Sequence, residues 1–103
     1  MPIPKFLQPY LASYNVDHLD KDDPVVAGEI ITQVLNLGDD EAVAWIFENY
    51  TLEKIRDIIK KPQRGVWFKE SLDYWSKILK VDIEDDLSQA AIFNLNPFGE
   101  NYV

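Results

Sequence analysis

The sequence predicts an all-α protein, a compact single-domain bundle of about five helices. Apolar residues recur at intervals of three and four along most of the chain, which is the spacing of one face of an α-helix. Residue types that begin and end helices stand at the boundaries of these segments. The alternation of apolar and polar residues that marks a strand is nowhere sustained. We therefore expect one helical domain over residues 1–103, with a mobile tail from about residue 98.

The clearest helix is expected over residues 24–37. Asp23 is a typical N-cap, and Pro24 suits the first helical position, where a backbone amide would have no partner. Gly38 follows at the position where many helices end. The inward face of this helix is predicted to consist of Val26, Ile30, Val34 and Leu37.

Two further helices are expected between residues 40 and 61. Asp39 or Asp40 caps the first of them, Thr51 caps the second, and Pro62 ends the second. Their inward faces are predicted to be Val43, Ile46, Phe47 and Tyr50 in the first, and Leu52, Ile55, Ile58 and Ile59 in the second.

A fourth helix is expected from about Trp67 to Leu79, after a turn at residues 63–66. Its inward face contains Phe68, Leu72, Trp75 and Leu79, and we expect Trp75 at the centre of the core. Glu84, Asp85 and Asp86 would open a fifth helix with Ile83, Leu87, Ala90 or Ala91, and Leu95 inward. Before residue 20 the chain is less regular, although Pro9 could open a short helix.

Composition excludes several classes of protein. The 103 residues include no Cys and one His, so disulfide scaffolds, thiol nucleophiles and two-histidine metal sites within one chain are excluded. The longest apolar run, Ala42 to Phe47, is too short to span a membrane. No secretory signal opens the chain. We expect a cytoplasmic protein with no membrane partner.

No residue pattern indicates catalysis, a cofactor or a metal. The single histidine, His18, stands in a polar turn, where we interpret it as a surface or capping residue. The glycines are too widely spaced for a phosphate-binding loop. The acids around residues 17–23 lack the spacing and the glycine of a calcium loop. Asp82, Glu84 and Asp86 alternate as in such a loop, but its glycine and final glutamate are missing, and both clusters suit helix N-termini. We therefore expect no enzyme and no cofactor.

Charge is strongly segregated along the chain. The net charge of −8 conceals a basic segment, residues 54–80, with eight basic and three acidic residues. Residues 1–53 have two basic and ten acidic residues, and residues 81–103 have five acids and no base. One interpretation is a bipolar surface with two different partners. We favour the other, in which the acidic and basic segments pair within the protein or are solvated on separate faces, and we expect pairing with the protein's own acids to leave little positive surface.

The basic segment also predicts helix, short turn and helix, the outline of a helix-turn-helix DNA reader. The second helix exposes Glu70 and Asp73, which would repel phosphates. DNA binding through residues 51–80 is therefore the second hypothesis. The candidate surface for a partner or nucleic acid consists of Arg56, Lys60, Lys61, Arg64, Trp67 and Lys69.

Two aromatic residues of the fourth helix share one predicted face. Trp67 and Tyr74 are seven residues apart, close to two helical turns. This face is either a second core layer or an exposed aromatic patch for a partner. We favour the core, because a small domain needs its large side chains for burial.

Between residues 14 and 81 a set of mostly apolar residues forms a wider pattern. It consists of Leu19-Asp20, Ile30-Ile31-x-x-Val34-Leu35-x-x-Gly38-Asp39, Trp45-Ile46-x-x-x-Tyr50, Ile55-x-x-x-Ile59 and Tyr74-Trp75-x-x-x-Leu79. The pattern resembles a small uncharacterised bacterial all-helical family, often encoded beside abortive-infection-type nucleotidyltransferase toxins. The turn at residues 62–67 departs from the more basic, Ser- or Thr-containing stretch of that family, which disfavours DNA binding.

The leading expectation for function is a non-catalytic protein-interaction module. The resemblance implies the antitoxin-side partner of a bacterial toxin–antitoxin pair. The acidic N-terminal half or the acidic C-terminal segment would cover a basic surface on the partner. Charge would speed association, and aromatic residues would supply most of the affinity.

Overall fold

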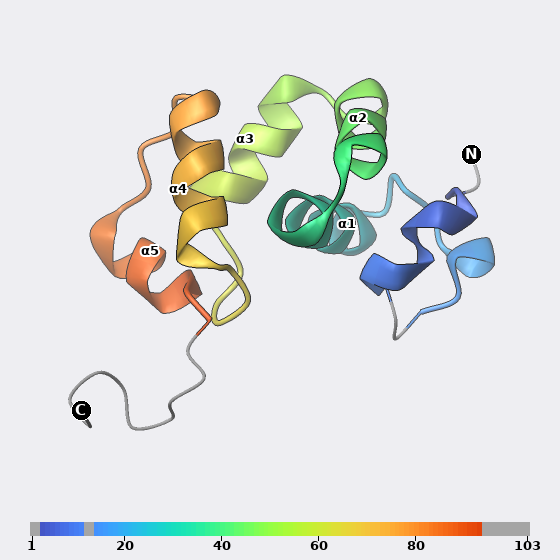
Figure 1. The fold of residues 1–103 in the computed structure, drawn as a ribbon, viewed down its shortest axis with the longest axis horizontal. Helices are drawn as coiled ribbons and strands as arrows, with labels where there is room; N and C mark the ends of the chain where they lie inside the picture. The colour runs from blue at the N-terminus through green and yellow to red at the C-terminus, as the bar shows by residue number, and fades with distance from the viewer. Residues whose placement is uncertain (1–2, 12–13, 94–103) are drawn as a thin grey trace.

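The computed structural model describes residues 3–11 and 14–93, and this part of the chain is all-α, as the sequence predicts (Figure 1). The mobile tail expected from about residue 98 lies outside these residues. The described chain begins with two 3-10 helices, η1 (Lys5–Leu11) and η2 (Val16–His18). Five α-helices follow: α1 (Pro24–Leu37), α2 (Asp40–Asn49), α3 (Leu52–Lys60), α4 (Lys69–Ile78) and α5 (Asp85–Ala91).

The centre of the fold is α1, which contacts η1, α2, α3 and α4. In Figure 1 it lies between η1 on one side and α3 and α4 on the other. Eight of its fourteen residues are buried, so it has almost no solvent face. Both predicted boundaries are confirmed. The Asp23 carboxylate accepts the amides of Val25 and Val26, and the Gly38 amide donates to the Val34 carbonyl.

The predicted N-caps of α2 and α3 are also confirmed. The Asp39 side chain accepts the Ala42 amide, and the Thr51 side chain accepts the Lys54 amide. The predicted inward positions Ile46, Ile55 and Ile59 are confirmed, and Ala42 is buried beside them. The inward faces are otherwise only partly correct, because the side chains at four predicted inward positions are exposed: Leu37, Phe47, Leu52 and Phe68.

The predicted start of α4 is wrong by two residues, and this changes the role of Trp67. The helix begins at Lys69, so Trp67 lies in an extended segment and its indole enters the core, where it is fully buried. Its amide donates to the Ala91 carbonyl, and its own carbonyl accepts the Phe93 amide. Trp67 and Tyr74 therefore do not share a helical face.

The prediction that Trp75 occupies the centre of the core is wrong as well. Trp75 is only partly buried and packs against the edge of the core. Its indole Nε1 donates to the Leu35 carbonyl of α1 at 2.7 Å. The large side chain in the core is that of Trp67, which precedes the first turn of α4 and is fully buried.

The two ends of the described chain are attached in different ways. At the N-terminal end η1 is a 3-10 helix with Pro9 inside it, not a helix opened by Pro9, and Leu7 and Leu11 are buried. At the C-terminal end Ala91 of α5 is buried, whereas Leu87 is exposed, against expectation. The predicted inward Leu95 lies outside the described residues. None of the described helices is long and apolar enough to cross a membrane.

The chain reverses after α4 at Lys80, which has a φ of 56°, in the left-handed region. The Val81 amide donates to the Ser76 carbonyl at 2.9 Å, and the Lys80 amide donates to the Lys77 carbonyl. This is a Schellman motif, in which glycine usually occupies the position of Lys80, because a Cβ there crowds the backbone.

We expect Lys80→Gly to raise the free energy of unfolding by about 1 kcal/mol, because it removes that crowding. Urea unfolding followed by circular dichroism measures the change. Lys80→Ala is the matched control, because it removes the charge and keeps the Cβ. An equal gain from both variants would show that charge, and not the backbone, is responsible.

Candidate functional site

The predicted basic surface is dispersed over the molecule. Arg56 and Lys60 lie on one cleft, and Lys61 and Arg64 are exposed in the connection between α3 and α4. Trp67 is buried, so its assignment to a partner surface is wrong. Lys69 is the first residue of α4, and the other end of this ten-residue helix is about 15 Å away. The six candidate residues therefore do not form one surface.

The expected pairing between the basic segment and the acids outside it is not found among the described residues. Lys69 is the one base of residues 54–80 with an ion pair there, at 2.8 Å from Asp73 in the same helix. The hydrogen bond to Asp73 raises the pKa of Lys69, although both side chains are largely exposed. The other bases of the segment stand in solvent or at clefts.

One cleft, of about 610 Å³, separates α3 from residues 80–82. Arg56 donates its Nε hydrogen to the Leu79 carbonyl at 2.9 Å. This hydrogen bond caps the C-terminal end of α4. Basic and acidic residues balance in this cleft, so it offers no excess positive charge to a phosphate. The charged residues that line it are Arg56, Lys60, Lys80, Glu53, Asp57 and Asp82.

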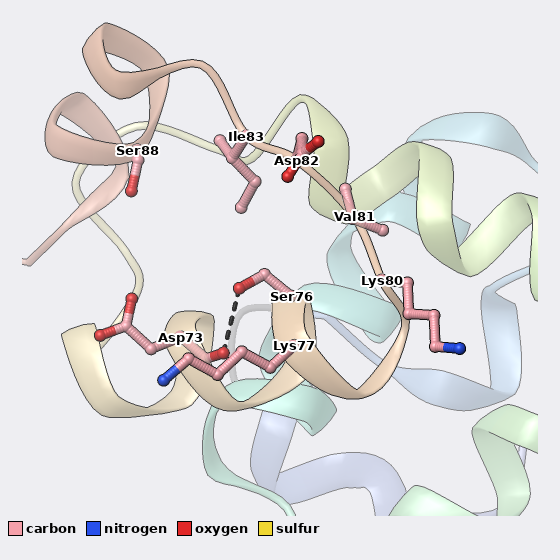
Figure 2. Close-up of a pocket in the computed structure, with 8 residues that line it drawn as sticks. All are labelled: Asp73, Ser76, Lys77, Lys80, Val81, Asp82, Ile83 and Ser88. Carbon is pink, nitrogen blue, oxygen red and sulfur yellow. Dashed lines mark hydrogen bonds between the residues drawn. The ribbon is translucent and has the colours of Figure 1, made fainter.

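A second cleft, of about 520 Å³, lies between α4 and residues 80–88 (Figure 2). Asp73, Ser76 and Lys77 project from α4 on one side, and Ile83 and Ser88 face them across the opening. The Ser76 hydroxyl donates to the Asp73 carbonyl of its own helix. No histidine lines this cleft, so neither serine has a neighbouring imidazole base.

The single histidine, His18, is exposed at the end of η2 and lines neither cleft. Within residues 3–11 and 14–93 no group of three or more His, Asp or Glu side chains is placed to hold a metal ion. Among the described residues, neither a histidine-based triad at these clefts nor a metal-holding cluster is therefore present.

The most distinctive surface feature is a row of four apolar side chains on α2 and α4, which we name the aromatic ridge: Phe47, Tyr74, Trp75 and Ile78. The Phe47 and Trp75 ring centroids are 5.7 Å apart, and those of Tyr74 and Trp75 are 5.0 Å apart, edge to face. Ile78 follows Tyr74 by one turn of α4. The exposed fractions are 37% for Phe47, 56% for Tyr74 and 55% for Ile78.

Sequence reasoning missed this ridge because it assigned Phe47 and Trp75 to the core. A signal was present in α4: Tyr74 and Ile78 lie at i and i+4, away from the face that Leu72 and Leu79 define. The corresponding signal was absent in α2, where the apolar spacing does not distinguish Phe47 from its buried neighbours.

A polar contact joins the segment before α1 to the C-terminal end of α2. The Tyr50 hydroxyl donates to the Lys21 carbonyl at 2.9 Å, and the Lys21 ammonium lies 5.5 Å from the Tyr50 ring centroid. Burial, with smaller contributions from the carboxylates of Asp22 and Asp20, raises the pKa of Tyr50. The phenol stays protonated and holds these two segments together.

No protein-family model, no curated protein and no solved structure matches this chain.

Proposed function

We propose that the chain is a non-catalytic protein-interaction module of the cytoplasm, and that it binds its partner through the aromatic ridge. The observation that carries the proposal is the exposure of three large apolar side chains, Phe47, Tyr74 and Ile78, around one partly buried indole. Contiguous exposed apolar side chains of this kind are typical of interaction sites, and aromatic anchors dominate the binding energy of protein interfaces.

The ridge is rigid enough to serve as an anchor. The Trp75 indole is fixed by its hydrogen bond to the Leu35 carbonyl, and both neighbouring rings pack against it. Side chains that are already ordered lose little conformational entropy when a partner binds. A ridge held in this way therefore supports affinity beyond its area.

The partner we propose is a toxin, with this chain on the antitoxin side. Support comes from the resemblance of residues 14–81 to a family encoded beside nucleotidyltransferase toxins. The product of the gene adjacent to the one encoding this chain is therefore the partner to test first.

Co-expression of the chain with that gene product tests the proposal. We expect the two to co-purify, and we expect Tyr74→Ser combined with Ile78→Ser to abolish co-purification while the helical spectrum is unchanged. The matched control combines Val25→Ser with Leu87→Ser, two exposed apolar residues outside the ridge. Co-purification that survives in the ridge variant would overturn the proposal.

DNA binding through residues 51–80 is the alternative, and the geometry favours it less. Eight residues, 61–68, connect α3 to α4, whereas a helix-turn-helix uses a turn of about three or four. Fluorescence anisotropy with a labelled duplex at low salt distinguishes the two. Micromolar binding that is lost with added salt, and lost on replacing the bases by Ala, would favour the DNA reader. The four bases replaced are Arg56, Lys60, Lys61 and Arg64.

A further inference from the structure

Carboxylates border the aromatic ridge along α2. The exposed positions of this helix are Asp40, Glu41, Ala44, Phe47 and Glu48, and Asp40, Ala44 and Phe47 follow one stripe along it. Glu41 and Glu48 form a second stripe about 100° further round, so every charged residue on the outer face of α2 beyond Phe47 is an acid. The helix contains no basic residue, so nothing on it balances these charges.

These carboxylates are not engaged elsewhere in the described part of the chain. The ion pairs found there join Lys5 to Asp17, Lys21 to Asp22 and Lys69 to Asp73, and none includes an acid of α2. On the α4 side of the ridge, Glu70 and Lys77 are both exposed and offset each other. The border of the ridge is therefore acidic on one side and neutral on the other.

The acids of residues 82–86 do not contribute to this border. Asp82 lines the cleft that also contains Asp73 and Ser76. Those two residues lie on the flank of α4 opposite to Tyr74 and Ile78. Of the two acidic regions of the chain, the one beside the ridge is therefore α2.

We propose that the aromatic ridge and the outer face of α2 together bind a basic amphipathic helix of the protein partner. This inference rests on the proposed function and adds the chemistry of the segment that is bound. The apolar face of such a helix would cover Tyr74 and Ile78, which lie one helical turn apart along α4, and Phe47 of α2. Its Lys and Arg residues would face Asp40, Glu41 and Glu48.

A second copy of this chain fits the surface less well than a basic partner does. Among the described helices, α3 comes nearest to a basic amphipathic helix, with Lys54, Arg56 and Lys60. Its apolar face, Ile55 and Ile59, is fully buried in the core and so is not available to another molecule. The charges and the burial of this face therefore favour a different protein as the occupant.

Peptides of defined composition test the inference with the full chain. The probe is a fluorescent amphipathic peptide with Leu on one face and Lys on the other, followed by anisotropy. Two comparison peptides replace every Lys by Glu or every Leu by Ser. We expect the Lys–Leu peptide to bind at low salt and to weaken with added salt, because exposed charges are screened. Neither comparison peptide should reach half-saturation at the same concentrations.

Variants of the chain locate the binding surface. Tyr74→Ser with Ile78→Ser should weaken binding of the Lys–Leu peptide by about tenfold or more, because it removes apolar anchors. Asp40→Asn, Glu41→Gln and Glu48→Gln together should weaken it several-fold and flatten the salt dependence. The matched control, Asp82→Asn, Glu84→Gln and Asp85→Asn, removes the same charge from the other acidic region and should leave binding unchanged.

Three outcomes would overturn the inference: equal binding of the Glu–Leu peptide, an equal loss in the control triple variant, or a dimer in light scattering that the ridge variant abolishes. Its failure is distinguishable from failure of the proposed function. If the peptide does not bind but the neighbouring gene product still requires Tyr74 and Ile78, the partner chemistry is wrong and the interaction function stands. If the gene product does not require the ridge, both proposals fail.

Discussion

Replacing Trp67 by Ala is expected to lower the free energy of unfolding by about 3–5 kcal/mol, a large part of the stability of a domain of this size. Trp67 is the largest fully buried side chain in the described chain, at 0% exposure. Its removal leaves a cavity in the hydrophobic core that the surrounding side chains can fill only in part. Urea unfolding followed by circular dichroism measures the loss.

Two further tryptophan variants make this prediction specific. Trp67→Phe keeps an aromatic ring and removes an indole Nε1 that has no hydrogen-bond partner among the described residues. It should therefore lose much less stability than Trp67→Ala. Trp75→Ala removes a partly buried ring and one hydrogen bond, and should also lose less. A larger loss for Trp75→Ala than for Trp67→Ala would contradict the arrangement of the core.

The second large effect is expected at Asn36, where Asn36→Ala should lower the free energy of unfolding by about 2–4 kcal/mol. The Asn36 side chain donates to the Val66 carbonyl at 2.7 Å and accepts the Phe68 amide at 2.9 Å. Asn36 is 8% exposed and the two bonds are part-buried, so its loss leaves the Val66 carbonyl and the Phe68 amide without their protein partners. Thermal or urea unfolding measures the effect.

Asn49→Ala is the matched control for Asn36→Ala. The Asn49 side chain also donates to a carbonyl, that of Trp45, but this carbonyl belongs to the preceding turn of its own helix. Its removal should be much less damaging, because no other segment depends on that contact. Equal losses for the two variants would show that Asn36 does not join separate segments. Faster hydrogen exchange at the Phe68 amide in Asn36→Ala would support its capping role directly.

Local sequence signals were sufficient to predict α1, α2 and α3. Each of these helices begins at a side chain that accepts a nearby amide, namely Asp23, Asp39 or Thr51. Both the residue type and its position relative to the apolar spacing can be read within a few residues. The predicted N-termini of α1 and α3 were therefore accurate to the residue, and that of α2 was accurate to within one residue.

The start of α4 could not be predicted in this way. No side chain near Phe68 caps the helix, and the acceptor for the Phe68 amide comes from Asn36, 32 residues earlier. A cap supplied from so far away leaves no local pattern. The same cause misplaced Trp67, because a helix extended to residue 67 turns its ring toward Tyr74 and not into the core.

The candidate site was harder to predict than the fold, for a similar reason. Charge segregation is a property of the sequence, but whether Arg56 approaches an acid or a carbonyl depends on how α3 crosses the end of α4. The ion pair between Lys69 and Asp73 follows from their spacing within one helix. The aromatic ridge joins residues almost thirty positions apart. The exposure of its side chains depends on how closely α4 packs against α1 and α2, which the sequence does not specify locally.

The long-range cap of α4 also affects the order in which the chain becomes structured. The first three α-helices can nucleate from their own sequences, whereas α4 and α5 have no side-chain cap of their own. α4 gains its starting contact only once the C-terminal end of α1 is in place. Since the ridge takes Phe47 from α2 and Tyr74 and Ile78 from α4, it exists only when both helices are in place. A chain in which α4 had not formed would present Phe47 alone and would lack two of the three exposed apolar side chains of the proposed binding surface.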